Sequence, residues 1–261
     1  MPQATPVMPG AEPFDLPGGP VGVLLCHGFT STPQSLRDWG EHLAAAGLTV
    51  RCPLLPGHGT SWQDCNVSTH EQWTTEVERA LDELTATCDR VFVAWLSMGG
   101  TLATRLAEVR SDDVAGLLLV NPALFTQRLD AKLLPLIARL TGSWAPIASD
   151  IKKPGVTELA YPKLPTRAML QLRSLWALTR ADLQRVTVPV IVFHSIEDHV
   201  VEPANSEVLL ASVSSRDTTE VVLGNSYHVA TLDHDAPQIF ERSVAWIRER
   251  TPATEPGRTT S

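Results

Sequence analysis

The sequence predicts an α/β fold built on a mostly parallel sheet with helices on both faces. Short runs rich in valine and leucine recur along the chain, and segments of helical periodicity separate them. The alternation is interrupted once, because the 66 residues between Asn121 and Val188 contain no convincing strand. The six expected strands are residues 21–26, 48–51, 90–95, 114–120, 189–195 and 219–224.

Helix signals lie between these strands. Thr32 followed by Pro33 favours a helix to about Ala46, since a proline in the first turn forfeits no hydrogen bond. Ser68 and Glu71 have the spacing of a capping box, and the apolar residues after them line one face of a second helix. Further helices are expected at residues 98–109, 203–212 and 235–248.

The segment without strands is expected to form a small helical cap inserted after the fourth strand. It is too long for a loop in a compact domain, and it contains apolar helical stretches at 133–140 and 168–178. An insertion there lies at the carboxyl ends of the strands, where open α/β sheets bind ligands. The predicted organisation is one core domain of residues 1–121 and 186–250, a cap of residues 122–185, and a flexible tail of residues 251–261.

The composition argues against several classes of function. A net charge of -8 with 19% charged residues is unfavourable for binding a phosphate backbone, so no nucleic-acid partner is expected. The first twenty residues lack the basic and apolar regions of a signal peptide, and no apolar run is long enough to span a bilayer. Together with four cysteines that lack metal-site spacing, these features predict a cytoplasmic protein with free thiols and no metal.

Residues 94–100, AWLSMGG, contain the first candidate for chemistry. A bare S-x-G is common by chance, but Ser97 directly follows a predicted strand and precedes a helix, as in a nucleophile elbow. Trp95 stands where the G-x-S-x-G pattern has glycine, and an indole there needs space from its neighbours. Small residues that could provide this space are Thr101, Ala103, Ala115 and Gly116.

A serine nucleophile needs a base, and the base needs an acid that orients it. Asp198 follows the fifth predicted strand and His228 follows the sixth, in the chain order serine, acid, histidine. Taken alone, either residue could be an ordinary loop residue, but their order and placement favour a catalytic triad. Glu197 is the rival acid, and Asp198 is preferred because it stands farther past the strand.

An oxyanion hole needs two backbone N–H donors, one of them from the residue after the nucleophile. Met98 supplies that donor, and Phe29, in the loop HGFTSTP after the first strand, is the candidate for the other. Gly28 would allow the tight path of this loop. His27 and His58 are interpreted as loop braces, although a catalytic role for His27 is the alternative.

These stretches resemble the bacterial monoacylglycerol lipases, close relatives of the small carboxylesterases with the α/β-hydrolase fold. The resemblance spans nearly the whole chain and is carried by HGFTSTP, LPGHG, LSMGGTL, SDIKKPGVTELAY, EDHVV and NSYHVATLD. It implies the same triad and oxyanion donors. It also implies that the cap shapes an acyl tunnel and a glycerol pocket through Ile147 and Glu158, with a solvated cap charge as the alternative for Glu158.

The expected function is hydrolysis of carboxylic esters, above all of monoacylglycerols to glycerol and fatty acid, through an acyl-enzyme and without a cofactor. A general short- or medium-chain carboxylesterase is the near alternative. A non-catalytic binding protein, in which Trp95 distorts the elbow, is the alternative from another class. The expected partner is a small lipid ester, and the apolar cap could also contact micelles or a membrane surface. The sequence does not indicate an oligomeric state.

Overall fold

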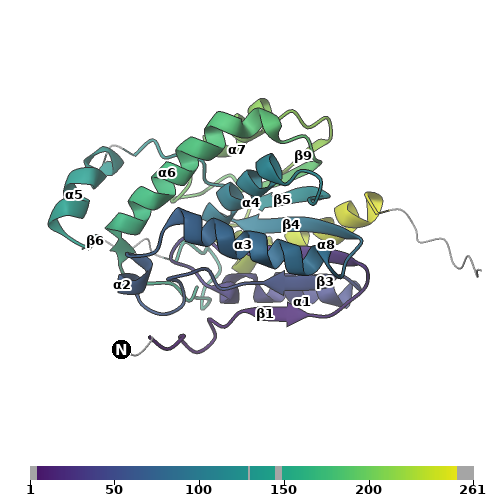
Figure 1. The fold of residues 1–261 in the computed structure, drawn as a ribbon, viewed down its shortest axis with the longest axis horizontal. Helices are drawn as coiled ribbons and strands as arrows, with labels where there is room; N and C mark the ends of the chain where they lie inside the picture. Colours follow the sequence, from purple (N-terminus) through teal and green to yellow (C-terminus); the bar gives the residue numbers. More distant parts are fainter. Residues whose placement is uncertain (1–4, 129, 145–148, 252–261) are drawn as a thin grey trace, which may run out of the picture.

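The computed structural model describes residues 5–128, 130–144 and 149–251. Its centre is a seven-stranded sheet in the order β1-β3-β2-β4-β5-β8-β9, in which every pair is parallel except β1 with β3 (Figure 1). The strands are β1 (Phe14–Leu16), β2 (Val21–Cys26), β3 (Thr49–Cys52), β4 (Arg90–Leu96), β5 (Gly116–Val120), β8 (Val190–Ser195) and β9 (Thr218–Leu223).

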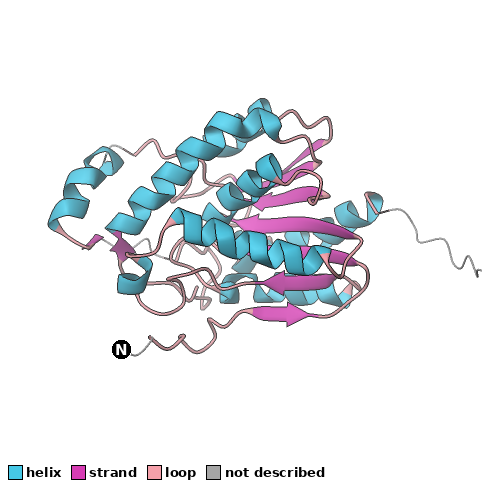
Figure 2. Ribbon diagram, in the orientation of Figure 1, coloured by secondary structure: helices cyan, strands magenta, loops and turns pink. Residues whose placement is uncertain are grey.

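Helices cover both faces of this sheet, as Figure 2 shows. Side chains alternate along each strand, so that Leu24 packs into one hydrophobic cluster and Val23 into the other. The first cluster contains side chains from α3 (His70–Thr85), α4 (Met98–Val109), α6 (Thr166–Asp182) and α7 (Ala204–Ser212), and the second from α1 (Arg37–Ala45) and α8 (Ala236–Glu249). The α/β-hydrolase fold predicted from the sequence is therefore confirmed.

Two local features differ from the expectation. The antiparallel edge strand β1 was not predicted, because its three residues lie between Pro13 and Pro17 and are too few to show a period. The capping box of α3 lies one residue later than predicted, at Thr69 and Gln72. Ser68 instead accepts a hydrogen bond from the indole of Trp73.

Between β5 and β8 the chain leaves the sheet and returns. Its elements include α5 (Leu134–Leu140), which stands away from the sheet in Figure 1, the short antiparallel pair β6 (Ser143–Trp144) and β7 (Leu164–Pro165), and α6. A short helix, α2 (Trp62–Cys65), lies beside β7. The α6 helix begins directly after β7 and packs its Leu172 and Leu175 into the core.

Residues 149–161, here called the strap, run back from this region over the carboxyl ends of the strands. The Tyr161 N–H donates to the Thr30 carbonyl at 3.1 Å, and the Val229 N–H donates to the Asp150 carbonyl at 3.0 Å. The strap is thus tied at both ends to loops that follow strands of the sheet. No helix within the described ranges is long and apolar enough to cross a bilayer.

Candidate active site

Ser97 occupies the sharp turn between β4 and α4. Its φ of 59° and ψ of -121° lie in a region that costs an L-residue about 1–3 kcal/mol. A Cβ on Gly99 would lie 2.6 Å from the carbonyl oxygen of Cys26, so only glycine lets the helix begin this close to the sheet. Among the described non-glycine residues, Thr30, Ser97 and Asn121 have positive φ. All three follow strands at the same edge, which is where backbone strain is concentrated.

The structure brings Ser97, His228 and Asp198 into one hydrogen-bonded chain. The His228 Nε2 and Ser97 Oγ atoms are 2.9 Å apart, and the His228 Nδ1 and Asp198 Oδ2 atoms are 2.8 Å apart. The other Asp198 oxygen accepts the N–H groups of Val200 and Val201 at 2.8 and 2.7 Å. With its carboxylate held on both sides, Asp198 orients the imidazole ring toward the serine hydroxyl.

The surroundings favour an ion pair between Asp198 and His228. Burial disfavours the charge on His228, but the charge and hydrogen bond of Asp198 outweigh it and raise the pKa of His228 above its ordinary value of 6.5. Burial likewise opposes ionisation of Asp198, and the contact with His228 together with the two N–H donors holds the pKa of Asp198 below its usual value. The ring is therefore suited to receive a proton while the carboxylate stays charged.

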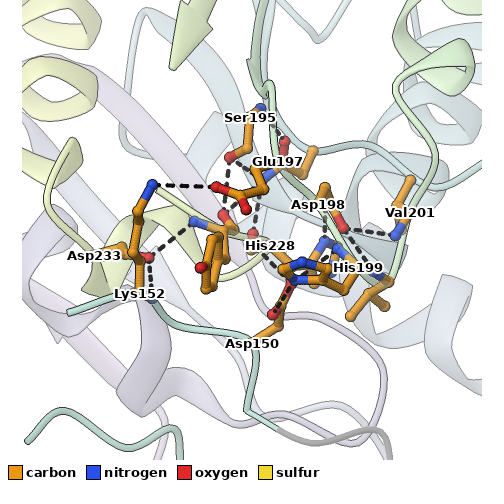
Figure 3. A network of polar contacts seen from close by, with 12 residues as sticks. Asp150, Lys152, Ser195, Glu197, Asp198, His199, Val201, His228 and Asp233 are labelled. Carbon is orange, nitrogen blue, oxygen red and sulfur yellow. Dashed lines mark hydrogen bonds and ion pairs between the residues drawn. The ribbon is translucent and has the colours of Figure 1, made fainter. Parts of the chain in front are cut away.

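Glu197, the rival acid, lies away from the imidazole. Figure 3 shows its carboxylate paired with Lys152 of the strap, at an Oε2 to Nζ distance of 3.2 Å, while Asp198 contacts His228. The Glu197 side chain is 53% exposed, against 2% for Asp198. Standing farther past the strand does place Asp198, and not Glu197, within reach of the histidine.

The loop after β2 passes close to Ser97. A Cβ added to Gly28 would lie 3.3 Å from the Ser97 Cβ, so a side chain at this position would crowd the serine. Phe29 follows, and its ring packs against those of His58 and Trp73. Within the described part of the chain, no protein acceptor takes the N–H of Phe29 or of Met98. Both donors remain available to an oxygen atom bound beside Ser97.

Two buried histidines support this loop. The Nε2 of His27 accepts the N–H of Leu55 at 3.3 Å, which leaves the proton on Nδ1 to donate to the Gly28 carbonyl at 3.0 Å. Burial lowers the pKa of His27 to about 4 and that of His58 to about 3. Since both His27 nitrogens serve the backbone, His27 has no free site for proton transfer and acts as a brace.

Trp95 is fully buried on the face covered by α3 and α4. Its Nε1 donates to the carbonyl oxygen of Leu24 at 3.1 Å, so its polar atom is satisfied. The space for the indole does not come from Gly116, which faces Trp246 on the opposite side of the sheet. The register places Leu119 beside Trp95 on β5, and Gly99 approaches the Trp95 Cβ. The elbow therefore keeps its geometry with tryptophan in place of glycine.

A cavity of about 340 Å³ opens at Ser97 and extends under the cap. Most of its walls are apolar, as expected for a site that holds a hydrocarbon chain. The apolar side chains include Phe125, Leu134, Ile137, Met169, Leu172 and Trp176. The described residues include no cluster of histidine, cysteine and carboxylate side chains that could hold a metal ion.

Glu158 is a polar part of the cavity wall near His228. Its N–H donates to the Ser149 Oγ at 3.0 Å. Burial raises the pKa of its carboxyl above the usual value, against the opposing effects of Ser31 and His228. Glu158 is thus a half-buried carboxyl that faces the site and not a solvated charge. Ile147, the other predicted cap residue, lies outside the described residues.

Asn121 directly follows β5 and was not predicted as a site residue. Its Nδ2 donates to the His228 carbonyl at 2.7 Å and to the Ser195 Oγ at 3.1 Å, and its Oδ1 accepts the Ser195 N–H at 2.8 Å. It therefore joins the ends of β5 and β8 to the histidine loop. A polar residue directly after a buried strand was the available signal.

The family model for serine aminopeptidases, S33, matches residues 21–235, which is most of the chain and includes the elbow, the acid and the histidine. The chain belongs to this family. This chain is also 45% identical to the thermostable monoacylglycerol lipase of Bacillus sp. (strain H-257), over 95% of this chain and 98% of that protein. The resemblance predicted from the motifs is confirmed.

Two further comparisons agree. A solved structure of metagenome-derived lipolytic enzymes superposes with a TM-score of 0.91 at 41% identity, covering 94% of this α/β-hydrolase and all of that chain. A carboxylesterase of Bacillus subtilis (strain 168) is 22% identical over 88% of this chain and 93% of that protein. The chain is therefore a serine ester hydrolase in fold and family.

Proposed function

We propose that Ser97, His228 and Asp198 hydrolyse carboxylic esters through an acyl-enzyme. The observation that carries this proposal is the chain of hydrogen bonds of 2.9 and 2.8 Å that ends at a serine in a strained turn. The Ser97 Oγ attacks the ester carbonyl carbon while the His228 Nε2 takes the hydroxyl proton. The N–H groups of Phe29 and Met98 stabilise the oxyanion.

Collapse of this tetrahedral intermediate breaks the bond to the alcohol, and His228 gives its proton to the departing oxygen. Water then attacks the acyl-enzyme, with His228 again as the base, and releases the carboxylic acid. Asp198 stays ionised throughout and stabilises the imidazolium that forms twice in each cycle. No step needs a metal or an organic cofactor.

We propose monoacylglycerols as the substrate class. Support comes from the name of the 45% identical relative and from a cavity that is apolar under the cap and polar near His228. We propose that the Glu158 carboxyl, which lines the cavity together with His228, accepts a hydrogen bond from a glycerol hydroxyl. We also propose Ile147 as an acyl-tunnel residue, solely because the sequence resembles the bacterial monoacylglycerol lipases. A general carboxylesterase is the second candidate, favoured by the Bacillus subtilis relative.

A hydrolysis panel distinguishes the two candidates. Mono-, di- and triacylglycerols are compared with p-nitrophenyl acetate, in the natural protein and in Glu158→Leu. Loss of a hydrogen bond to a carboxyl costs about 1.5–3 kcal/mol, so kcat/KM for monoacylglycerol should fall about tenfold or more in the variant. Acetate hydrolysis should change far less. Equal loss on both substrates, or no preference of the natural protein for monoacylglycerols, would favour the general esterase.

We also propose that the cap, residues 122–185, contacts lipid surfaces. Leu133, Leu136, Leu140 and Trp144 are exposed there. The cap carries ten lysines and arginines against four acidic residues, whereas the whole chain carries 21 against 29. Exposed leucines beside cations are typical of helices that lie on anionic bilayers.

Sedimentation with phosphatidylglycerol vesicles tests this contact. The double variant Leu136→Ser/Leu140→Ser should sediment less than the natural protein. Val222→Ser is the matched control, because Val222 is exposed on β9, outside the cap. Equal sedimentation of all three proteins would show that the cap does not bind the vesicles.

The division into a core of 1–121 and 186–250, a cap, and a tail of 251–261 remains a proposal, supported by the departure of the chain from the sheet after β5. A cytoplasmic location is also a proposal. It is supported by the four cysteines, which are free thiols, since reducing compartments keep thiols in this form.

A further inference from the structure

Asp150 of the strap contacts both loops that carry the acid and the base. Its Oδ2 accepts the N–H of His199 at 3.1 Å and the N–H of His228 at 3.2 Å. Its Oδ1 lies 2.8 Å from the His199 Nδ1, and its backbone carbonyl accepts the Val229 N–H at 3.0 Å. Figure 3 shows this carboxylate below the His228 and His199 rings, between the loops after β8 and β9.

The backbone of His228 is therefore held from two sides. From the core, Asn121 donates to the His228 carbonyl at 2.7 Å. From the cap, Asp150 accepts the His228 N–H, and among the described residues no other acceptor takes it. A rotation of this peptide unit would move the imidazole away from Ser97, and misplacement of a reacting group by about 1 Å can cost about 100-fold in rate.

The charge of Asp150 acts in the same direction as its geometry. The imidazolium form of His228 is stabilised first by Asp198, then by Glu158 and Asp150. Around Asp150 itself the facing titratable groups are His199 and His228, while the nearby Lys152 is engaged with Glu197 and lies over the Tyr227 ring. The Asp150 side chain is only 13% exposed, so its field on His228 is weakly screened by solvent.

We infer that Asp150 is a positioning residue for His228, carried by the cap, so that the base is fully aligned only when the strap is docked. This inference rests on the proposed role of His228 as the catalytic base. It gives the strap a part in the chemistry, beyond its part in shaping the cavity.

Two substitutions separate alignment from charge. Asp150→Ala removes the acceptor of the His228 N–H, so kcat should fall about 10- to 100-fold on p-nitrophenyl acetate while KM changes much less. Asp150→Asn keeps an oxygen for that N–H, so its kcat should stay within about fivefold of the natural enzyme. Because the negative charge is gone, the acid limb of its kcat/KM profile should move to lower pH.

Lys152→Met is the matched control. It breaks the Lys152 contact with Glu197 and so weakens strap docking without touching His228. The alternative is that Asp150 holds the strap in place and does not position His228. In that case, Lys152→Met and Asp150→Ala would each lose kcat in proportion to the fall in melting temperature. The inference requires that Asp150→Ala lose far more kcat than Lys152→Met for each degree by which the melting temperature falls.

An unchanged kcat in folded Asp150→Ala would overturn the inference. If that variant does not fold, Asp150→Asn decides, and an acid limb at the natural position contradicts the inference. Failure of the proposed function looks different, because the natural enzyme itself would then show no Ser97-dependent hydrolysis.

Discussion

The two halves of the active site are held in different ways. The core half consists of the turns after β2 and β4, where Phe29, Ser97 and Met98 are fixed by backbone geometry and by close glycine contacts. It also includes the loops after β8 and β9, which carry Asp198 and His228. The cap half consists of the strap and of helices α5 and α6, and it is joined to the core by side-chain contacts such as those of Asp150. Under the proposed function, the sheet positions the reacting groups and the cap selects the substrate.

This difference predicts how substitutions in each half affect turnover. Substitutions in the core half should abolish turnover for every ester or unfold the protein. Substitutions in the cap half should change rates by smaller factors that depend on substrate or pH.

Ser97→Ala and His228→Ala should each lower kcat by about 10⁴- to 10⁶-fold for long and short esters alike, because triad members act as a unit. The double variant should be hardly slower than either single variant. Kinetics on a monoacylglycerol and on p-nitrophenyl acetate check this, with circular dichroism as the control for folding. If the losses of kcat in the two single variants added up in the double variant, the two residues would not act together in one catalytic triad.

Asp198→Asn should lower kcat by about 10⁴-fold, because an amide no longer holds the imidazole in the required tautomer. Glu197→Gln is the matched control one residue away, and it should leave kcat within about twofold because the Glu197 carboxylate contacts Lys152 and not His228. Steady-state kinetics of the two variants decide between the acids. A severe loss in Glu197→Gln would reverse the assignment.

Trp95→Gly should destabilise the fold by about 3–5 kcal/mol, because it leaves a ring-sized cavity in a fully buried position. It also leaves the Leu24 carbonyl without its indole donor. Activity below the melting transition should change little. Denaturant unfolding measures the loss, and Trp39→Ala, a fully buried tryptophan in α1 on the other face, calibrates it. A gain in both stability and kcat would show that the indole strains the elbow.

His199→Gln should have the smallest effect, a change in the pH dependence of the melting temperature that comes from the contact of His199 with the strap. The hydrogen bond and charge of Asp150 raise the pKa of His199 above 6.5. A raised histidine pKa stabilises the folded state fully below the unfolded value of about 6.5, and this stabilisation is lost as pH rises through the folded value. The melting temperature of the natural protein should therefore exceed that of the variant most at acidic pH, with a difference that shrinks toward alkaline pH. A difference that grew with pH would contradict the ion pair.

The core half could be predicted from the sequence because its residues follow strands directly. Ser97 and Met98 are the first residues after β4, and Asp198 and His228 follow β8 and β9 in the order that a triad requires. A strand end fixes the edge at which a side chain lies, so position along the chain is enough to bring these residues together.

The cap half could not be predicted in the same way. Asp150 lies in a segment without regular structure, and its contacts span 49 and 78 positions of the chain. Of the four small residues expected to make room for Trp95, Ala115 and Gly116 lie on the face of α8, opposite the indole, whereas Ala103 packs in the same cluster as Trp95. Nothing local in the sequence indicates either packing arrangement, because both depend on which distant surfaces meet.

Labelling with a fluorophosphonate probe tests whether Ser97 is a nucleophile activated by His228. The folded natural protein should gain one covalent adduct, located at Ser97 by peptide mass spectrometry, and the rate of labelling should fall as His228 becomes protonated. Ser97→Ala should remain unlabelled, and His228→Ala should label far more slowly. A folded natural protein that gains no adduct, or gains it at another residue, would show that Ser97 is not the activated nucleophile.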